Sequence, residues 1–179
     1  DAVETLDERD GVAAFMFDSL FTSDGILPPG GQSLQRAATR VREAGGLVIA
    51  DEVQAGFGRC GTEFWGFETA GVVPDVVTLG KPMGNGHPVA AVVTRSDIAA
   101  ASMDDSGVFS TFGGNPVSSA AALAVLDVIE EQDLLARTTA VGEYLDDELR
   151  RVVTPHGGTV RSSGLMVGVD LHGSSKLRG

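Results

Sequence analysis

The stretch "TLGKPMGNGHPV" (residues 78–89) places a lysine where ordinary folding gives no reason for one. The apolar run "VVTL" leads directly into Gly80 and Lys81, and a proline and a loop with two further glycines and His87 follow. Lysine is rarely buried without a partner, and a glycine-rich loop suits the close approach of backbone to a ligand. Lys81 is therefore a candidate ligand-binding residue.

Short apolar runs alternate with helical patterns on both sides of this stretch. We expect strands at 12–19, 47–50, 75–79 and 89–95, and helices at 32–45, 115–135 and 136–153. The run "LVIA" (47–50) is continuously apolar, which is typical of a strand buried on both faces of a parallel sheet. The strand at 89–95 follows its predecessor too closely for a helical crossover, so we expect it to run antiparallel. The pattern predicts an α/β fold with a mostly parallel sheet flanked by helices.

The composition restricts the class of protein. The formal net charge is −12, with 13 Lys and Arg against 25 Asp and Glu in 179 residues. This argues against a nucleic-acid partner, because phosphate binding needs a basic face. No apolar stretch approaches the roughly 18 residues that a membrane span needs, so we expect no membrane partner. Cys60 is the only cysteine, which excludes an internal disulfide and a cysteine-based zinc site and fits a cytoplasmic location.

Two ionisable residues follow the ends of predicted strands. Asp51 comes directly after 47–50, and Lys81 comes two residues after 75–79. If these strands are parallel neighbours, both side chains lie in the crevice outside the carboxyl ends of the strands, where ligands bind. Pyridoxal 5'-phosphate suits this pair, because a lysine forms a Schiff base with its aldehyde and an acid keeps its ring nitrogen protonated. The alternative is an aspartate that caps the next turn and pairs with the lysine.

Three longer stretches carry a family resemblance: "GGLVIADEVQAGFGRCG" (45–61), "FWGFETAGVVPDVVTLGKPMGNGHPVAAVV" (64–93) and "STFGGNPVSSAAALAVLDVIE" (110–130). In their order and spacing, the chain resembles the class III aminotransferases of the fold type I pyridoxal-phosphate enzymes. The resemblance implies a cofactor-binding large domain at 1–133, with its N-terminal part missing. It also implies the beginning of a truncated small C-terminal α+β domain at 134–179.

The resemblance also implies roles for five residues. Asp51 matches the acid that pairs with the pyridine nitrogen, Val53 the side chain packed on the ring face, and Gln54 the amide near the ring hydroxyl. Lys81 matches the lysine that forms the internal aldimine and moves the proton between the substrate carbon and the cofactor. Thr111 matches the threonine that reaches the cofactor phosphate of the other subunit. That match implies a homodimer with shared active sites.

Each of these assignments has a structural alternative. Val53 is otherwise a core valine, Gln54 a solvated loop amide, and Thr111 an N-terminal cap of the helix that follows it. His87 could serve as an acid or base, but holding its own loop is the favoured interpretation. Cys60 lacks the histidine and acid neighbours of a catalytic thiol.

The resemblance implies an aminotransferase that moves an amino group from an amine or amino acid to a keto acid. Asp18-Ser19 stands where many class III aminotransferases carry a Glu-Pro pair. With the loop "NGHPV" (85–89), that pair looks closer to the branch that includes ethanolamine-phosphate phospho-lyase and the mitochondrial-type alanine-glyoxylate aminotransferases. A lyase acting on a phosphorylated amino alcohol is therefore one alternative, and a catalytically incomplete fragment is another.

The two ends of the sequence lead us to expect a fragment. The chain opens on Asp1 without an initiator methionine and closes on "SSKLRG" (174–179), just after the strand-like run "GLMVGVDL" (164–171). Compared with the family, the sequence lacks the glycine and hydroxyl phosphate cup and the C-terminal arginine that meets the substrate carboxylate. We therefore expect the isolated chain to be an incomplete enzyme.

Overall fold

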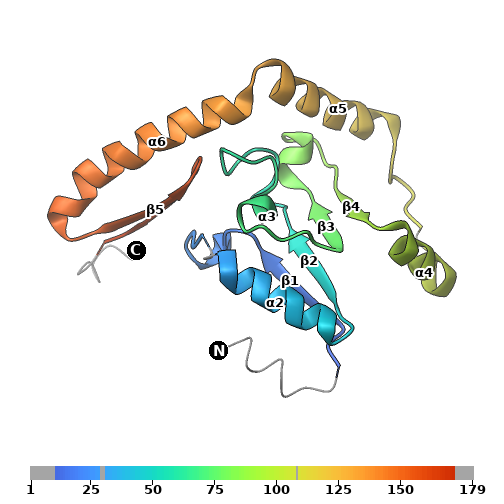
Figure 1. The fold of residues 1–179 in the computed structure, drawn as a ribbon. Helices are drawn as coiled ribbons and strands as arrows, with labels where there is room; N and C mark the ends of the chain where they lie inside the picture. Colours follow the sequence, from blue (N-terminus) through green and yellow to red (C-terminus); the bar gives the residue numbers. More distant parts are fainter. Residues whose placement is uncertain (1–10, 29–30, 108, 172–179) are drawn as a thin grey trace.

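The centre of the molecule is a four-stranded sheet in the order β1-β2-β3-β4 (Figure 1). This computed structural model describes residues 11–28, 31–107 and 109–171. The strands are Ala14–Asp18 (β1), Leu47–Asp51 (β2), Val76–Leu79 (β3) and Ala91–Thr94 (β4). β1, β2 and β3 run parallel, and β4 runs antiparallel to β3. The four strands and their directions are those that the sequence predicted.

Helix α2 (Gly31–Glu43) covers one face of this sheet (Figure 1). Its apolar side chains share a buried cluster with those of the strands and of the segment before β3: Phe17, Leu34, Ala38, Val41, Val48, Ala50, Ala70 and Val72. On the opposite face, Met16 pairs in register with Ile49 and is 54% exposed. The expectation that β2 is buried on both faces is therefore wrong. Val48 and Ala50 are buried, and the residues that alternate with them are only half-buried, because α2 covers only one face of the strand.

A buried carboxylate fixes the beginning of β3. Asp75 is 7% exposed, and its Oδ2 accepts a hydrogen bond from the backbone N–H of Val48 at 2.9 Å. Arg95 donates to Oδ1, and Arg42 forms an ion pair with Oδ2 at 3.4 Å. Because a buried charge is costly unless it is paired, these contacts tie β3 to β2 and to the end of β4.

Several shorter helical segments lie between the strands. They are α3 (Gly66–Thr69), α4 (Ser96–Ser106) and the 3-10 helices η1 (Thr22–Asp24), η2 (Lys81–Gly84) and η3 (Thr154–His156). Neither α3 nor α4 was predicted. α3 is a single turn, and the sequence of α4, "SDIAAASMDDS", is small and acidic without a strong apolar stripe.

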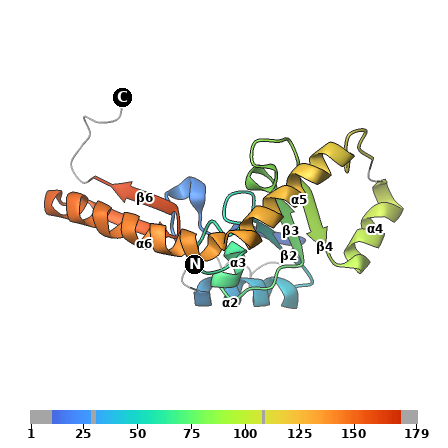
Figure 2. The same ribbon diagram turned by 90° about the horizontal axis from the view of Figure 1, so that it is seen from above.

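Helices α5 (Pro116–Glu131) and α6 (Leu134–Val153) form a long arm across the sheet (Figures 1 and 2). A hairpin of β5 (Thr159–Ser163) and β6 (Met166–Asp170) packs along α6. The strand β6 was expected and β5 was not. On α6, a Cβ at Gly142 would collide with the backbone of Gly164 in the hairpin turn. Only glycine permits this close approach.

The hairpin also contacts the first part of the chain. Arg161 Nε donates to the carbonyl of Gly25 at 3.0 Å, and the N–H of Leu165 donates to the carbonyl of Arg59 at 3.1 Å. Asp133, in a left-handed conformation, stands directly before α6. The division into domains at 133 and 134 stays a prediction.

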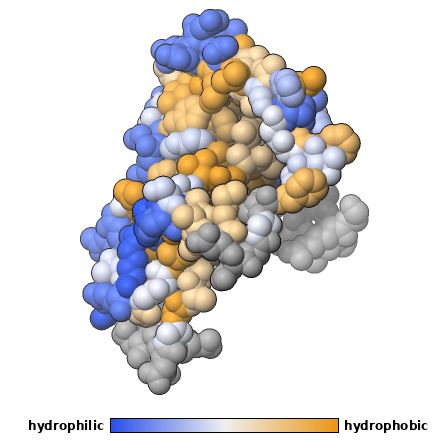
Figure 3. Space-filling model, turned by 90° about the vertical axis from the view of Figure 1, so that its right-hand side faces the viewer, coloured by the Kyte–Doolittle hydropathy of each residue, from blue (hydrophilic) through white to orange (hydrophobic). Residues whose placement is uncertain are grey.

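Apolar side chains are exposed on β4, on the segment before α5 and on α5 itself. The large ones are Val92, Val93, Phe109, Phe112, Val117, Leu123, Leu126 and Val128. Figure 3 views this side of the molecule and shows apolar surface between hydrophilic margins. Among the described helices, none combines the length and the apolar character of a membrane span.

Candidate cofactor site

Asp51 and Lys81 stand at the carboxyl ends of two neighbouring parallel strands. Asp51 is the last residue of β2 and pairs in register with Thr78 of β3, and Lys81 begins η2 two residues after β3 ends. Thr78 Oγ1 donates to Asp51 Oδ1 at 3.3 Å. The structure thus places the predicted acid and the predicted lysine at one edge of the sheet, where α/β sheets bind ligands.

The two carboxylate oxygens of Asp51 have different surroundings. Oδ1 accepts from Thr78 Oγ1 and from the backbone N–H of Val53, the latter at 3.0 Å. Among the described residues, no side chain or backbone group donates to Oδ2. The side chain is half-buried. Asp51 is therefore anchored through one oxygen, and the other has no protein donor among the described residues.

The backbone at Lys81 is unusual. Its φ is 36°, a left-handed value that non-glycine residues seldom adopt, and it directly precedes Pro82. The N–H of Met83 donates to the carbonyl of Gly80 at 2.9 Å, which closes the turn around the lysine. The Lys81 side chain is exposed. Strained backbone of this kind clusters at functional sites and persists where the surrounding structure fixes it.

Val53 and Gln54 lie next to these two residues. A Cβ built at Gly80 would be 3.6 Å from Val53 Cγ1, so Val53 packs against the residue before the lysine. Val53 is half-buried and belongs to neither buried core cluster, which disfavours the alternative of an ordinary core valine. Gln54 Nε2 donates to Thr22 Oγ1 at 2.6 Å, so this amide is not simply a solvated loop group.

Thr111 is not brought to the Asp51–Lys81 edge by any hydrogen bond in the described chain. It is exposed in the segment before α5. The N-terminal cap of α5 is Asn115, whose Oδ1 accepts from the N–H of Ser118 at 2.9 Å. The alternative of Thr111 as a cap is therefore wrong. Its contact with a partner subunit stays a prediction.

His87 anchors the end of the lysine loop. Its Nε2 lies 2.9 Å from the Oγ of Ser118, which is buried in the first turn of α5. The same hydroxyl lies 3.3 Å from the carbonyl of Pro88 and 2.9 Å from Asn115 Nδ2. These contacts connect the loop after Lys81 to the start of α5. They fit the interpretation that His87 holds its loop.

Glu52 is a buried residue next to the site, and it was not predicted from the sequence. Its carboxylate accepts from Ser19 Oγ and from the backbone N–H groups of Gly66 at 2.7 Å and Phe67 at 3.0 Å. Burial raises the pKa of Glu52 above its ordinary value. Successive residues of an extended strand point to opposite faces, so the adjacent pair Asp51-Glu52 was the available signal. Asp51 lies at the carboxyl end of β2, and Glu52 holds the loop that leads to α3.

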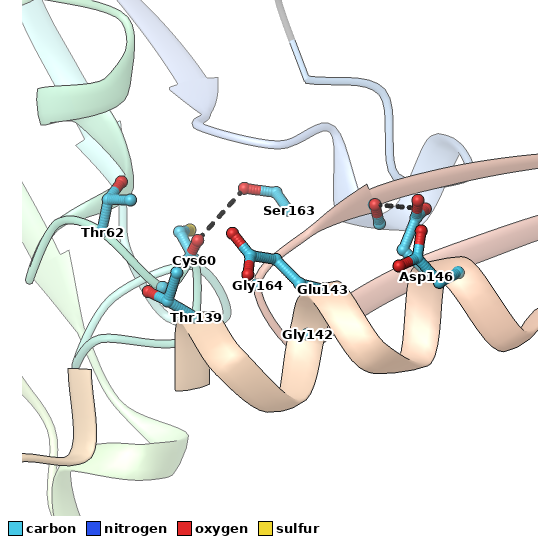
Figure 4. A pocket seen from close by; sticks show the side chains of 11 residues that line it. Cys60, Thr62, Thr139, Gly142, Glu143, Asp146, Ser163 and Gly164 are labelled. Atoms are coloured by element: carbon cyan, nitrogen blue, oxygen red, sulfur yellow. Dashed lines mark hydrogen bonds between the residues drawn. The ribbon is translucent and has the colours of Figure 1, made fainter. Parts of the chain in front are cut away.

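Cys60 lies away from this edge, beside a cavity of about 470 Å³ between α6 and the hairpin turn (Figure 4). Its Sγ donates to the carbonyl of Ala55 at 3.2 Å, and burial raises the pKa of the thiol to about 12. A thiol with so high a pKa is a poor nucleophile at neutral pH. Neither Asp51 nor Lys81 lines this cavity.

Comparison with known proteins identifies the family. Residues 1–178 match the family model for aminotransferase class-III. The chain is 51% identical over 173 residues to a Drosophila melanogaster protein named alanine–glyoxylate aminotransferase 2-like. That alignment covers 94% of this chain and 35% of the relative. The chain thus spans about a third of the length of this curated relative.

Two solved structures share the fold. A phospholyase from Arthrobacter, in complex with phosphoethanolamine, superposes with a TM-score of 0.87 at 43% identity, over 99% of this chain and 44% of that one. The ornithine aminotransferase of Toxoplasma gondii, described with partial occupancy of PLP at its active site, gives a TM-score of 0.85 at 32% identity, over 94% and 40%. Since the family match spans nearly the whole sequence and includes the strand ends that carry Asp51 and Lys81, this chain belongs to the class III aminotransferase family.

Proposed function

We propose that this chain is the cofactor-binding part of a pyridoxal-phosphate-dependent aminotransferase, which moves an amino group from an amine or amino acid to a keto acid. The observation that carries the proposal is the placement of Lys81 and Asp51 at adjacent parallel strand ends, with Asp51 Oδ2 free of protein donors among the described residues. The family match supports the same cofactor.

The residues present fit the cofactor. When bound, pyridoxal phosphate supplies an aldehyde that joins an amine and a ring that takes up electrons from it. Asp51 Oδ2 would hold the proton on the ring nitrogen, since Oδ1 is already engaged. Lys81 Nζ would hold the cofactor through its aldehyde, with release of water, and its amine would carry a proton at the substrate carbon. Val53 would pack on the ring, and Gln54 would hydrogen-bond near the ring hydroxyl.

A lyase acting on a phosphorylated amino alcohol is the second candidate. It is supported by the 43% identity to the Arthrobacter phospholyase. The 51% identity to the Drosophila protein named alanine–glyoxylate aminotransferase 2-like supports the first candidate. Both reactions use the same lysine and acid, so the Asp51–Lys81 edge does not separate them. The aminotransferase consumes a keto acid, whereas the lyase releases phosphate and needs no keto acid.

An assay of two products separates these candidates. The enzyme that contains this chain is supplied with a panel of amino acids and amines, with and without a keto acid, and separately with phosphoethanolamine. We expect a new amino acid to form from the keto acid and no inorganic phosphate to be released. Phosphate release from phosphoethanolamine without any keto acid would instead establish the lyase.

We also propose that the protein is a homodimer with shared active sites. The proposal is supported by the exposed apolar side chains that flank Thr111, since Phe109 is 87% exposed and Phe112 is 81% exposed. In a dimer these side chains would leave water as Thr111 approaches the other subunit. Sedimentation equilibrium of the cofactor-bound protein is expected to give twice the chain mass. Replacing Phe112 with serine is expected to shift the protein toward monomer, and replacing the exposed Val73 with serine serves as the control. A monomeric parent protein would contradict the proposal.

A further inference from the structure

Side chains of the loop after β1 form hydrogen bonds with the segment that contains Asp51. β1 and β2 are neighbours, and Asp18 pairs in register with Asp51 (Figure 1). Four residues beyond Asp18, Thr22 Oγ1 accepts from Gln54 Nε2 at 2.6 Å. Ser19 Oγ donates to the buried Glu52. Glu52 and Gln54, which alternate with Asp51 and Val53, are thus each hydrogen-bonded to a side chain of this loop.

Asp18 fixes the position of Thr22. Its Oδ1 accepts from the N–H of Leu20 at 3.0 Å, and its Oδ2 accepts from the N–H of Thr22 at 2.8 Å and from Thr22 Oγ1. Phe21 lies between these two donors with a φ of 48°, which is unfavourable for an aromatic residue. Such a conformation persists only where neighbouring contacts over-determine it. The hydrogen bonds of Asp18 on both sides of Phe21 supply those contacts.

The single hydroxyl proton of Thr22 then determines the orientation of the Gln54 side-chain amide. Three donors converge on the carboxylate of Asp18, so the single hydroxyl proton of Thr22 is directed to Asp18. A hydroxyl has only one proton to donate. Thr22 Oγ1 can therefore only accept from Gln54. The atom of Gln54 that faces Thr22 must be Nε2, and the carbonyl Oε1 must face away.

We propose that Asp18 and Thr22 are positioning residues that lock the side-chain amide of Gln54, so that one N–H and the Oε1 are presented to the cofactor in a fixed orientation. Among the described residues, Oε1 has no hydrogen-bond partner in the structure. The inference rests on the proposed function for the identity of the ligand. The hydrogen-bonded arrangement of Asp18, Thr22 and Gln54, which we call the lock, does not depend on the identity of the ligand.

Three variants test the lock. Thr22→Val removes the hydroxyl at nearly constant volume, Thr22→Ser keeps the hydroxyl, and Ser23→Ala changes an exposed neighbouring hydroxyl. Without cofactor, the side-chain amide of Gln54 is followed by NMR and identified by its loss in Gln54→Ala. We expect its hydrogens to exchange with water several-fold faster in Thr22→Val, and at the parent rate in the other two variants.

The same variants are then titrated with pyridoxal phosphate. Loss of one neutral hydrogen bond weakens an interaction by about 2- to 10-fold. We therefore expect Thr22→Val to bind the cofactor about 2- to 10-fold more weakly and to shift its absorption maximum, with Thr22→Ser restoring both. Weaker binding that Thr22→Ser does not restore, or that leaves the absorption maximum unchanged, would instead indicate a structural defect elsewhere.

The outcomes separate the inference from the proposed function. Unchanged exchange of the Gln54 amide in Thr22→Val overturns the lock, whether or not the cofactor binds. A changed exchange with unaltered cofactor affinity and absorption overturns the positioning role. If the parent chain binds no cofactor at Lys81, the proposed function fails while the NMR result still decides the lock. Should Thr22→Val fail to fold, Gln54→Glu replaces it, because Glu has no N–H for Thr22. An unchanged melting temperature in Gln54→Glu would overturn the lock.

Discussion

Replacing Lys81 with alanine is expected to abolish covalent capture of pyridoxal phosphate and to lower turnover of the enzyme at least about a thousandfold. In the proposed function the amine has two tasks, attachment of the aldehyde and proton transfer, and proton transfer by a positioned group alone contributes about 100- to 10,000-fold. The fold should survive, because the Lys81 side chain is exposed. Absorbance of the cofactor in the visible range measures capture, and a product assay measures turnover.

The sequence offers a matched control for this variant. Lys81 and Lys176 are its only two lysines, so Lys176→Ala removes the same chemical group elsewhere. The control is expected to keep both the visible absorbance and the turnover. Equal losses in the two variants, or a Lys81→Ala protein that still turns over at the parent rate, would contradict the assignment.

The Asp51→Asn variant is expected to retain some cofactor and to lose most catalysis. Asparagine Oδ1 can still accept from the N–H of Val53 and from Thr78 Oγ1, so the local structure should be preserved. In the proposed function, what is lost is the negative charge that Oδ2 would offer to the protonated ring nitrogen. A hydrogen bond to a charged group contributes up to about 3 kcal/mol, so a rate loss approaching about 100-fold is expected.

Two further measurements decide what Asp51 does. The melting temperature of Asp51→Asn should remain near that of the parent, because its anchoring contacts persist. Thr78→Val, which removes one of those contacts but keeps the charge, should reduce the rate far less. Near-normal turnover in Asp51→Asn would assign the aspartate a structural role.

The strand framework was predictable because its signals are local. The apolar runs before Asp51 and Lys81 indicated strands, and the short connection to β4 excluded a crossover, so both the parallel and the antiparallel pairing were confirmed. Strand order then places the two residues at one edge. The α/β class and the family are confirmed by the comparisons.

Other features depend on contacts between distant parts of the sequence. No periodicity reveals that Thr22 meets Gln54, because the hydrogen bond joins two loops 32 residues apart. The sequence does not show that Glu52 is buried, because its backbone donors, Gly66 and Phe67, lie 14 and 15 residues further along the chain. The expected burial of β2 on both faces was wrong, because a continuous apolar run does not show what covers each face.

Three expectations from the sequence stay predictions: the role of Thr111 at a partner subunit, the boundary at 133 and 134, and the cytoplasmic location.

The most direct test of the account is to locate the covalent attachment of the cofactor. The chain is mixed with pyridoxal phosphate, reduced with borohydride, digested and mapped by mass spectrometry. The cofactor mass is expected to be fixed on the peptide that contains Lys81, and Lys81→Ala is expected to abolish it. A tag found on Lys176 or on the N-terminal amine, with Lys81 unmodified, would contradict the account.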